Sequence, residues 1–556
     1  MSSVHPSYVP TEAAIQSVRD QLKGRIFRSV NGFFAKYFEG KPWSAAVQNK
    51  VQEAKSARPG SKLAAGVPDS DTLGEWLAEF QALFFANLHI HSQPLPNMGG
   101  TVIYLETSDR QSVAGSTRAF GEIHHGDAPV VAEADDDDVF LPFCERARQV
   151  FKAQSARCFV HGFLVRGSTL ELWVFDRAGA YSSERLDLAQ DPDLLMRTLA
   201  GYSLNSDEEA GFNTFVRSPA PRSDSYVIFH QRNKFHLRPE PIATAESIVG
   251  LGTTCYAALA STTGQPDTAI KFSWRQEEDP TELRLLKLAH ERNAWGIIRL
   301  LDYQELVTVA DLRQGLDFPQ PFVNRRFSCV ANTPLGRPIR QFTSIPELLE
   351  VLRDLVRALQ SLYVNARILH RDIAIKNLII TPQHSADSSK GTLLDFNYAL
   401  DLENARPIEP MIGSDGFMAI GILSGQRHTY RHDLESLFYV FLWIAIANDR
   451  VHDEATDIVK GLPETSRLWK WCTMDFGAVG RDKAADMSPE GFEGILGEFS
   501  PDFTPLQGLA RELHALVFPM RDGKIFTGTE TDPVAVQRLY DGMADAFSRS
   551  ASAFQS

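Results

Sequence analysis

The stretch ILHRDIAIKNLII, residues 368–380, places polar side chains between two short apolar runs. The runs at 368–369 and 378–380 have the pattern of buried strands. The polar residues between them are His370, Arg371, Asp372, Lys376 and Asn377. A polar group that loses water needs a hydrogen-bonding partner, so a core-embedded loop normally avoids such a concentration. The stretch is therefore either a solvated turn or a functional site.

Three further features accompany this loop in a fixed order. Gly250 and Gly252 lie between two predicted strands in SIVGLGTTCYAALA, and Lys271 lies in a predicted strand in TAIKFSW. After the loop, Asp395 and Phe396 follow an apolar strand in GTLLDFNYAL. Several motifs in one order are far more specific than any one of them alone, so together they favour the functional site.

This ordered set resembles the signature of the protein kinases, which combines a glycine-rich loop, a strand lysine, a catalytic loop and an Asp-Phe-Gly motif. More narrowly, the chain resembles the fungal-type protein kinase family. That resemblance spans most of residues 90–480 and is carried by ILHRDIAIKNLII, GFMAI (416–420), HTYRHDLESLFYVFLWI (428–444) and LELWVFDRAGAYSSERLDL (170–188). It implies an α+β, bilobal protein-kinase-like fold with a β-rich small lobe and an α-rich large lobe.

The order of patterns along the chain predicts four segments. Stretches rich in Pro, Gly and Ser at 56–71 and 218–225 are typical of boundaries. Residues 101–107, 158–167 and 170–179 are predicted strands, the last two forming a hairpin, and a helix is predicted between the first two. The segments are an N-terminal helical segment (1–71), an α/β accessory module (72–217), a kinase small lobe (226–335) and a kinase large lobe with C-terminal helices (336–556).

The kinase resemblance implies ATP and Mg²⁺ as cofactors and assigns roles around the catalytic loop. Asp372 would accept the proton of the substrate hydroxyl. Asp395 offers a carboxylate oxygen and Asn377 an amide oxygen, both hard ligands suited to Mg²⁺. The alternative is that Asp372 and Asn377 are structural loop residues.

The small lobe would hold the phosphates. Gly250 and Gly252 match the glycine-rich loop, and Lys271 matches the lysine that contacts the α- and β-phosphates. Glu282 is the expected acidic partner of that lysine, with Glu291 as the fallback. The structural alternatives are a plain hairpin turn for the glycines, a strand-edge position for Lys271 and a solvated helix face for Glu282.

Other residues would support the site. Lys376 stands where tyrosine kinases carry an arginine and could reach the transferred phosphoryl group as a point charge. His370 and Arg371 belong to the catalytic-loop motif. Asp433 matches the buried aspartate that holds the backbone N–H groups of that loop, although an ordinary helix N-cap is the alternative.

The sequence departs from the kinase pattern at four positions. Cys255 stands at the third glycine position of the loop, and Ala257 replaces a valine that packs on adenine. Asn397 follows Asp395-Phe396 in place of glycine, and we expect it to accept the unusual backbone angles needed there. Gly421 stands where an acidic residue anchors the activation segment, which casts doubt on the stability of residues 397–420.

The accessory module resembles a degenerate restriction-endonuclease-type fold. In the family's metal motif Glu133 would be the glutamate, but Asp135 replaces the lysine that activates the attacking water. We therefore expect a non-catalytic docking platform. The acidic run 133–138 is expected to be a solvated loop, and the pair Asp176-Arg177 is either a surface salt bridge or an inter-domain contact.

Charge and composition restrict the partners. A net charge of −14 argues against a general nucleic-acid binder, and no apolar run is long enough to span a membrane. Five scattered cysteines without a CxxC pair suggest neither zinc nor a disulfide framework. We expect an intracellular protein, cytoplasmic or nuclear, that acts on a protein substrate; the oligomeric state is not predicted.

Three functional hypotheses follow. The favoured one is an ATP- and Mg²⁺-dependent protein kinase acting on a Ser/Thr hydroxyl, with Tyr as a further acceptor. The second is a pseudokinase or scaffold that binds partners through a kinase fold. The third is a small-molecule phosphotransferase, which Arg371 disfavours because that residue is typical of protein kinases regulated through an activation loop. Retention of Lys271, Asp372, Asn377 and Asp395 favours the first.

Overall fold

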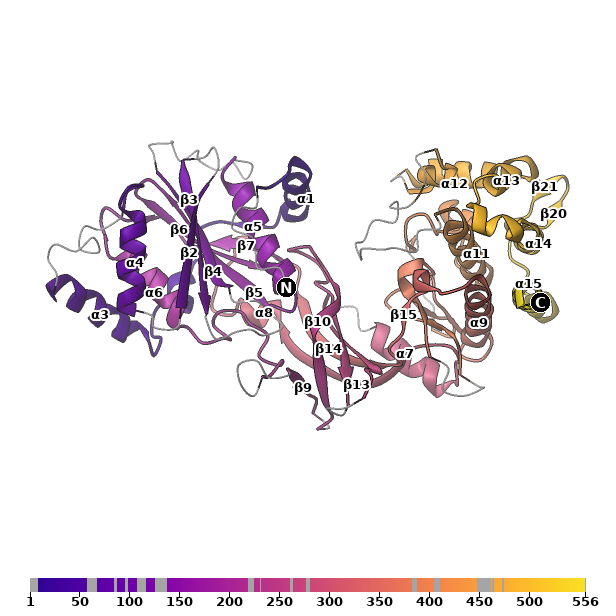
Figure 1. Ribbon diagram of the computed structural model, residues 1–556, viewed down its shortest axis with the longest axis horizontal. Helices are drawn as coiled ribbons and strands as arrows, with labels where there is room; N and C mark the ends of the chain where they lie inside the picture. Colours follow the sequence, from indigo (N-terminus) through magenta and orange to yellow (C-terminus); the bar gives the residue numbers. More distant parts are fainter. Residues whose placement is uncertain are drawn as a thin grey trace. The chain divides into compact units, whose positions relative to one another are not determined.

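The computed structural model divides the chain into two compact units (Figure 1). The first comprises Met1–Glu278 with Asp302–Ala331, and the second Asp279–Leu301 with Asn332–Ser556. The structure describes residues 9–57, 68–84, 88–95, 99–107, 117–125, 138–218, 225–230, 232–260, 264–276, 281–382, 388–404, 411–447, 462, 465–472 and 475–555. The four predicted segments divide the chain more finely, and their boundaries stay predictions.

The first unit contains a mixed sheet with strand order β1-β7-β6-β5-β4-β3-β2, and β8 pairs with β6. Strands β4 and β5 run parallel, as do β1 and β7, while the other neighbours are antiparallel. The predicted hairpin is confirmed as β5 and β6, which pair from Phe159↔Asp176 to Arg166↔Thr169. The strands are β1 (Ile26–Phe27), β2 (Leu88–Leu95), β3 (Gly100–Thr107), β4 (Thr117–His124), β5 (Phe159–Arg166), β6 (Thr169–Asp176), β7 (Gly179–Ser182) and β8 (Leu186–Asp187).

Helices lie on both faces of this sheet: α1 and α5 on one, α3, α4 and α6 on the other (Figure 1). The predicted N-terminal helical segment (1–71) contains three helices, but the prediction misses β1, which follows Gly24 (φ 68°) and pairs with β7. Aromatic side chains such as Phe140 and Trp173, with ring centroids 4.7 Å apart, fill the space under α5. The helices are α1 (Glu12–Leu22), α2 (Phe33–Tyr37), α3 (Ser44–Ala57), α4 (Leu73–Phe84), α5 (Phe140–Ala153) and α6 (Leu194–Leu204).

A second sheet of this unit has the order β13-β14-β12-β11-β10-β9. Strands β10 and β11 form a hairpin whose last paired residues are Thr244 and Thr254, so the loop between them carries Gly250 and Gly252. The elements are β9 (Tyr226–Ile228), β10 (Lys234–Thr244), β11 (Thr254–Leu259), β12 (Thr268–Gln276), β13 (Arg299–Thr308), α8 (Val309–Leu312) and β14 (Arg325–Thr333).

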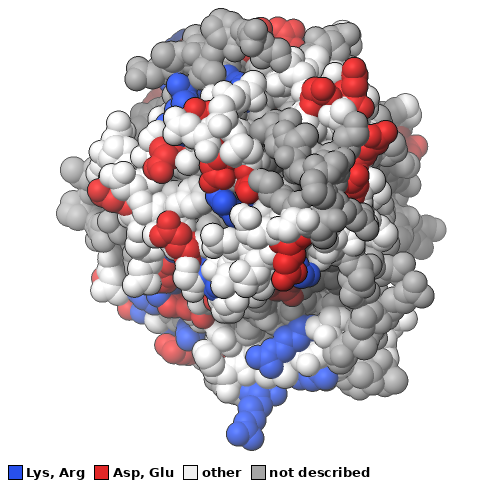
Figure 2. Space-filling model, turned by 90° about the vertical axis from the view of Figure 1, so that its left-hand side faces the viewer, with Lys and Arg blue, Asp and Glu red and all other residues white. Residues whose placement is uncertain are grey.

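Charged side chains are unevenly distributed on the face shown in Figure 2. Acidic side chains are scattered across it, and basic ones gather towards its lower edge. This distribution agrees with the acidic balance of the whole chain, whose net charge is −14.

The second unit is mainly helical. Helix α11 is buried along almost its whole length, as expected of an all-round apolar helix at the centre of a core. No helix among the described residues is long and apolar enough to cross a membrane. The helices are α7 (Thr281–Glu291), η2 (Ile339–Gln341), α9 (Ile345–Val364), η3 (Ile375–Asn377), α10 (Ile420–Leu423), α11 (Tyr430–Ala447), η4 (Arg467–Cys472), α12 (Phe476–Asp486), α13 (Pro489–Leu496), η5 (Pro501–Leu506), α14 (Gln507–Val517) and α15 (Pro533–Gln555).

Short strands in this unit frame the predicted catalytic loop. The two flanks of the opening stretch are confirmed as β16 and β17. The strands are β15 (Arg337–Pro338), β16 (Ile368–Leu369), β17 (Leu378–Ile380), β18 (Gly391–Leu393), β19 (Leu400–Asp401), β20 (Met520–Arg521) and β21 (Lys524–Ile525).

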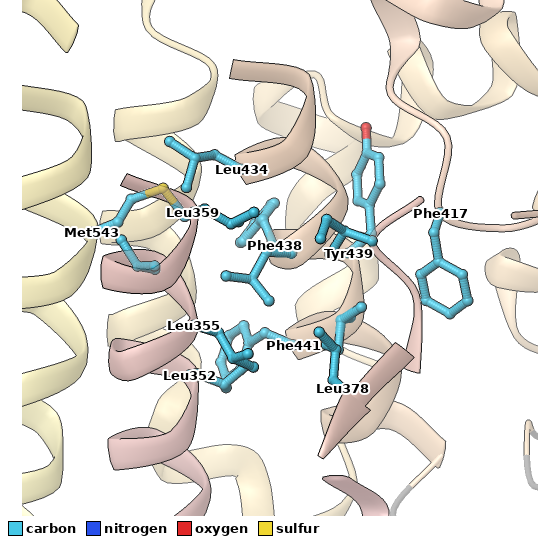
Figure 3. Close-up of a cluster of buried hydrophobic side chains, with 14 of the residues drawn as sticks. Leu352, Leu355, Leu359, Leu378, Phe417, Leu434, Phe438, Tyr439, Phe441 and Met543 are labelled. Carbon is cyan, nitrogen blue, oxygen red and sulfur yellow. The ribbon is translucent and has the colours of Figure 1, made fainter. Parts of the chain in front are cut away.

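The core beneath the loop is built by α9, α11 and α15 (Figure 3). Leu355 and Leu359 of α9 contribute to it, as do Phe438 and Phe441 of α11 and Met543 of α15, and all are at most 2% exposed. Burying a side chain of this size stabilises the fold by about 1.5–3 kcal/mol. The predicted catalytic loop therefore rests on a closely packed core. The predicted α+β class is confirmed, while the likeness of the module's sheet to a restriction endonuclease stays a prediction.

Candidate active site

The backbone of the predicted catalytic loop is held by Asp433, in the first turn of α11. The N–H groups of His370 and Arg371 donate to Oδ2 and Oδ1 of Asp433, each at 2.9 Å. Arg371 has a left-handed backbone (φ 66°), and the aspartate makes this turn possible by satisfying two adjacent donors. The side chain of Asp433 therefore acts on the loop rather than only on its own helix.

The ionisation of Asp433 is set by its neighbours. Burial alone would raise its pKa, but His428, 2.9 Å away, and the N–H donor of His370 lower the pKa below its usual value. The carboxylate is 3% exposed and stays charged at neutral pH. A charged acceptor forms stronger hydrogen bonds than a neutral one, which rigidifies the loop.

The carboxylate of Asp372 is buried, with 3% of the residue exposed. Asn377 Nδ2 donates to Oδ2 at 2.9 Å and to the main-chain oxygen at 2.8 Å. The hydroxyl of Ser414 donates to Oδ1 at 2.6 Å. Lys376 Nζ lies 3.8 Å from Oδ2 on a mostly exposed side chain. The loop therefore holds a fixed carboxylate that accepts a hydrogen bond from a hydroxyl group and has a cation beside it.

Asn377 and Asp395 lie at the same end of the β17–β18 hairpin. Leu378 pairs with Leu393, and the N–H of Leu394 donates to the carbonyl of Asn377 at 2.9 Å. The Nδ2 bonds of Asn377 to Asp372 turn its Oδ1 away from that carboxylate. A carboxylate and an amide oxygen at one end of a hairpin are a donor set that suits Mg²⁺ together with phosphate oxygens.

The backbone after β18 differs from the sequence-based expectation. Asp395 itself has a left-handed φ of 61°, whereas Asn397 does not have a positive φ. The expectation that Asn397 supplies the unusual angles is therefore wrong. Its N–H instead donates to Asp395 Oδ1 at 3.2 Å, which orients the carboxylate.

Gly421, which stands where the kinase pattern has an acidic anchor, is closely packed, and the effect of the missing anchor on residues 397–420 stays a prediction. A Cβ at this position would lie 2.4 Å from His432 Nε2, so the packing excludes a side chain. The adjacent N–H of Ile420 donates to Glu435 Oε1 at 2.7 Å, and Arg431 pairs with Glu435 at 2.6 Å. The described end of the activation segment is held by an acidic residue of α11 instead of one of its own.

A buried lysine of α12 provides a second anchor. Lys483 is 0% exposed, and its Nζ donates to the carbonyls of Gly416 at 2.8 Å and Met418 at 2.7 Å. Nζ also lies 4.2 Å from the ring centroid of Tyr439. Burial lowers the pKa of Lys483 to about 7, although the charge of Glu435 opposes the shift. The conformation of residues 416–418 therefore depends on this amine.

In the first unit, Lys271 lies on the face of β12 opposite to the buried Ile270 and Phe272. It pairs with Cys255 of β11, and Ala257 is the next residue on the same face. The side chains beside Lys271 on this face are small. This face is the one on which the kinase resemblance places the nucleotide.

The glycine-rich loop is attached to other parts of the first unit. The N–H of Gly250 donates to the carbonyl of Arg177 at 3.1 Å, and the carbonyl of Leu251 accepts from Trp274 N–H at 2.7 Å. A Cβ at Gly252 (φ 50°) would lie 2.6 Å from Arg177 Nε. Glycine at this position is explained by Arg177 and by the left-handed backbone.

Glu282 and Glu291 occupy the two ends of α7 in the second unit, whereas Lys271 belongs to the first. Glu282 is 9% exposed in the first turn, and Glu291 is exposed at the last residue. A charged residue is rarely buried without a partner, so Glu282 has the environment of a paired charge and Glu291 that of a solvated one. Which of them pairs with Lys271 stays a prediction.

The positions of the module's degenerate metal motif, Glu133 and Asp135, lie outside the described residues, as does most of the run 133–138. The pair after β6 is described. Asp176 accepts Nε and Nη2 of Arg313, both at 2.8 Å, in a salt bridge in which both side chains are 1% exposed. Asp176 therefore forms a buried salt bridge with Arg313, the residue directly after α8, and not a surface salt bridge.

Sequence reasoning missed the roles of Ser414, Glu435, Lys483 and Arg177. Ser414 lies two residues before GFMAI, one of the stretches that carry the kinase resemblance, and this position could have drawn attention to it. Nothing in the sequence indicates that Lys483 is buried, because a single lysine in an amphipathic helix normally lies on the solvent face. Its partners are main-chain carbonyls, which no side-chain pattern reveals.

A comparison with protein families places most of this site within a known family. The model of a family described as fungal protein kinase matches residues 127–445, more than half of the 556 residues. The matched region contains Lys271, Asp372, Asp395 and Asp433, together with much of the module that precedes the second sheet.

Proposed function

Because the chain belongs to the family of fungal protein kinases, we propose that it transfers the γ-phosphate of ATP to a protein Ser or Thr hydroxyl, with Tyr as a further acceptor. One observation carries the proposal. The buried carboxylate of Asp372, oriented by Asn377, accepts a hydrogen bond from the Ser414 hydroxyl at 2.6 Å. A carboxylate fixed in this way can orient a substrate hydroxyl and accept its proton.

The chain's own residues account for the remaining requirements. Lys376 lies beside Asp372 and can offset charge that develops on the transferred group. Lys271, on the partly exposed face of β12, would hold the nucleotide phosphates. Asp395 and Asn377 would hold Mg²⁺, which when bound neutralises charge on the phosphate oxygens.

A second candidate, a scaffold with a kinase fold, is favoured by the glycine loop. Glycine-loop amides normally contribute donors to phosphate, but the N–H of Gly250 is already bonded to the Arg177 carbonyl. An active kinase would then have to bind the phosphates through the other backbone N–H groups of the loop. Metal-dependent nucleotide binding separates the two candidates.

The test is thermal unfolding of the full chain with ATP and Mg²⁺, ATP and chelator, or Mg²⁺ alone. For ATP at about 100 times its dissociation constant, we expect a stabilisation of about 2.7 kcal/mol that requires the metal. Asp395→Asn should remove the metal-dependent part. The matched control is Asp522→Asn, an exposed position in the β20–β21 turn. Equal stabilisation with Mg²⁺ and with chelator would contradict metal-assisted catalysis and favour the scaffold.

A further inference from the structure

The glycine-rich loop, residues 245–253, contributes to the hydrophobic core of the accessory module. Ile248 is 0% and Val249 9% exposed, and both belong to the cluster that includes Val18 and Leu22 of α1 and Phe151 of α5. A loop that covers phosphates in solution would not need this burial. One side of the loop is therefore packed against the module.

Arg177, directly after β6, forms the centre of this contact. Its Nη1 donates to the carbonyls of Ser247 at 2.5 Å and Ile248 at 3.4 Å, and its Nη2 donates to that of Ser155 at 2.9 Å. The guanidinium carbon lies 4.1 Å from the ring centroid of Phe151. The residue is 0% exposed. A single side chain thus connects the loop to the end of α5.

The charge of Arg177 survives this burial. Burial lowers its pKa to about 10, which leaves the guanidinium protonated at neutral pH. A buried cation that donates to several carbonyls forms stronger hydrogen bonds than a neutral donor. Because the packing of Arg177 against Gly252 leaves no space for a Cβ, the loop and the arginine fit each other closely.

The N-terminal helix holds the same loop independently of Arg177. The N–H of Ile248 donates to Gln21 Oε1 at 2.9 Å, and Gln21 lies in the last turn of α1. At the surface, Glu246 pairs with Lys152 of α5 at 2.5 Å. The first half of the loop is therefore tied to both α1 and α5.

We propose that the accessory module, together with the N-terminal helix α1, sets the nucleotide affinity of the kinase by fixing the glycine loop, with Gln21 of α1 and Arg177 of the module as positioning residues. This inference rests on the proposed kinase function. A loop that is ordered before the ligand arrives does not lose that conformational entropy on binding, so affinity rises without any new ligand contact. The module would then be a part of the nucleotide-binding lobe, not a separable docking platform.

The first test compares two substitutions of Gln21 in the full chain. Gln21→Met has a similar size but no acceptor for the Ile248 N–H, whereas Gln21→Glu keeps an acceptor oxygen. We expect Gln21→Met to raise the KM for ATP about fivefold and to leave kcat unchanged. A fivefold change corresponds to the loss of one hydrogen bond worth about 1 kcal/mol. Gln21→Glu should have the same KM for ATP as the wild type. The matched control, Lys23→Met, alters an exposed residue two positions away.

The second test measures amide hydrogen exchange of residues 245–253 without nucleotide. Exchange should accelerate in Gln21→Met but not in Gln21→Glu or Lys23→Met, because only the first loses the tether. Equal KM values and equal exchange in all variants would overturn the inference. If the wild type bound no ATP while exchange depended on Gln21, the proposed kinase function would fail but the tether would stand.

Discussion

Lys483 gives the sharpest quantitative prediction, because it is an amine buried among carbonyls and aromatic rings. Its pKa is lowered from 10.5 to about 7 in the folded protein. Between these two values the unfolded chain binds the proton and the folded chain does not. Stability should therefore rise with pH across that window, by at most about 1.4 kcal/mol per pH unit. Below about pH 7 both states are protonated, and this contribution becomes constant.

The perturbation is Lys483→Met, which keeps an apolar stem of similar length but cannot titrate. The pH-dependent rise should disappear in this variant. Two carbonyls, of Gly416 and Met418, would also lose their donor, which costs about 1–3 kcal/mol each if they stay buried. Replacing a buried charge by an apolar group offsets part of that cost, so we expect the folded protein to persist.

The assay is urea unfolding of the full chain between pH 6 and 10, with wild type and Lys483→Met compared at each pH so that other titrating groups cancel. Lys470→Met, at an exposed position of η4, is the matched control and should keep the wild-type slope. The same slope in wild type and Lys483→Met would refute the reasoning. So would a wild-type stability that falls, relative to the variant, as pH rises from 7.

Other predictions concern transfer activity and the stability of the loop. Ser414→Ala should lower kcat about tenfold by removing a donor to the catalytic carboxylate, and Ser414→Thr should retain activity; equal kcat values would contradict this. Lys271→Met should abolish transfer without changing the melting temperature. In steady-state kinase assays, Glu282→Lys should lose as much activity as Lys271→Met, whereas Glu291→Lys should stay active. If Glu291→Lys lost more activity than Glu282→Lys, Glu291 would be the ion-pair partner of Lys271. Asp433→Asn should destabilise the protein by about 1–3 kcal/mol in urea unfolding, and an unchanged midpoint would refute its role.

The sequence predicted those parts of the site that depend on local patterns. Alternating or continuous apolar runs identified the strands around the catalytic loop and the β5–β6 hairpin, because burial of one face imposes a period on the sequence. The order of motifs placed Asp372 and Asn377 on one loop. Asp433 could be assigned by resemblance, since the family string includes it.

The features that sequence reasoning missed involve main-chain partners or distant packing. Lys483 and Arg177 act mainly through carbonyl oxygens, which every residue carries and no motif encodes. The helical segment at the N-terminus is interrupted by β1, which forms because it pairs with β7, far along the chain. Local helical periodicity cannot indicate such a pairing. Gly252 matched a phosphate-loop motif, yet its immediate neighbour is a buried arginine.

The central claim is that Asp372 serves as the catalytic base of a protein kinase, and transfer of labelled phosphate tests it most directly. The full chain is incubated with γ-labelled ATP, Mg²⁺ and a mixture of Ser-, Thr- and Tyr-containing peptides. The account predicts label on a peptide hydroxyl or on the chain itself, a loss of at least about a hundredfold in Asp372→Asn, and no loss in the exposed control Asp522→Asn. Equal incorporation by wild type and Asp372→Asn, or none by either despite metal-dependent ATP binding, would contradict it.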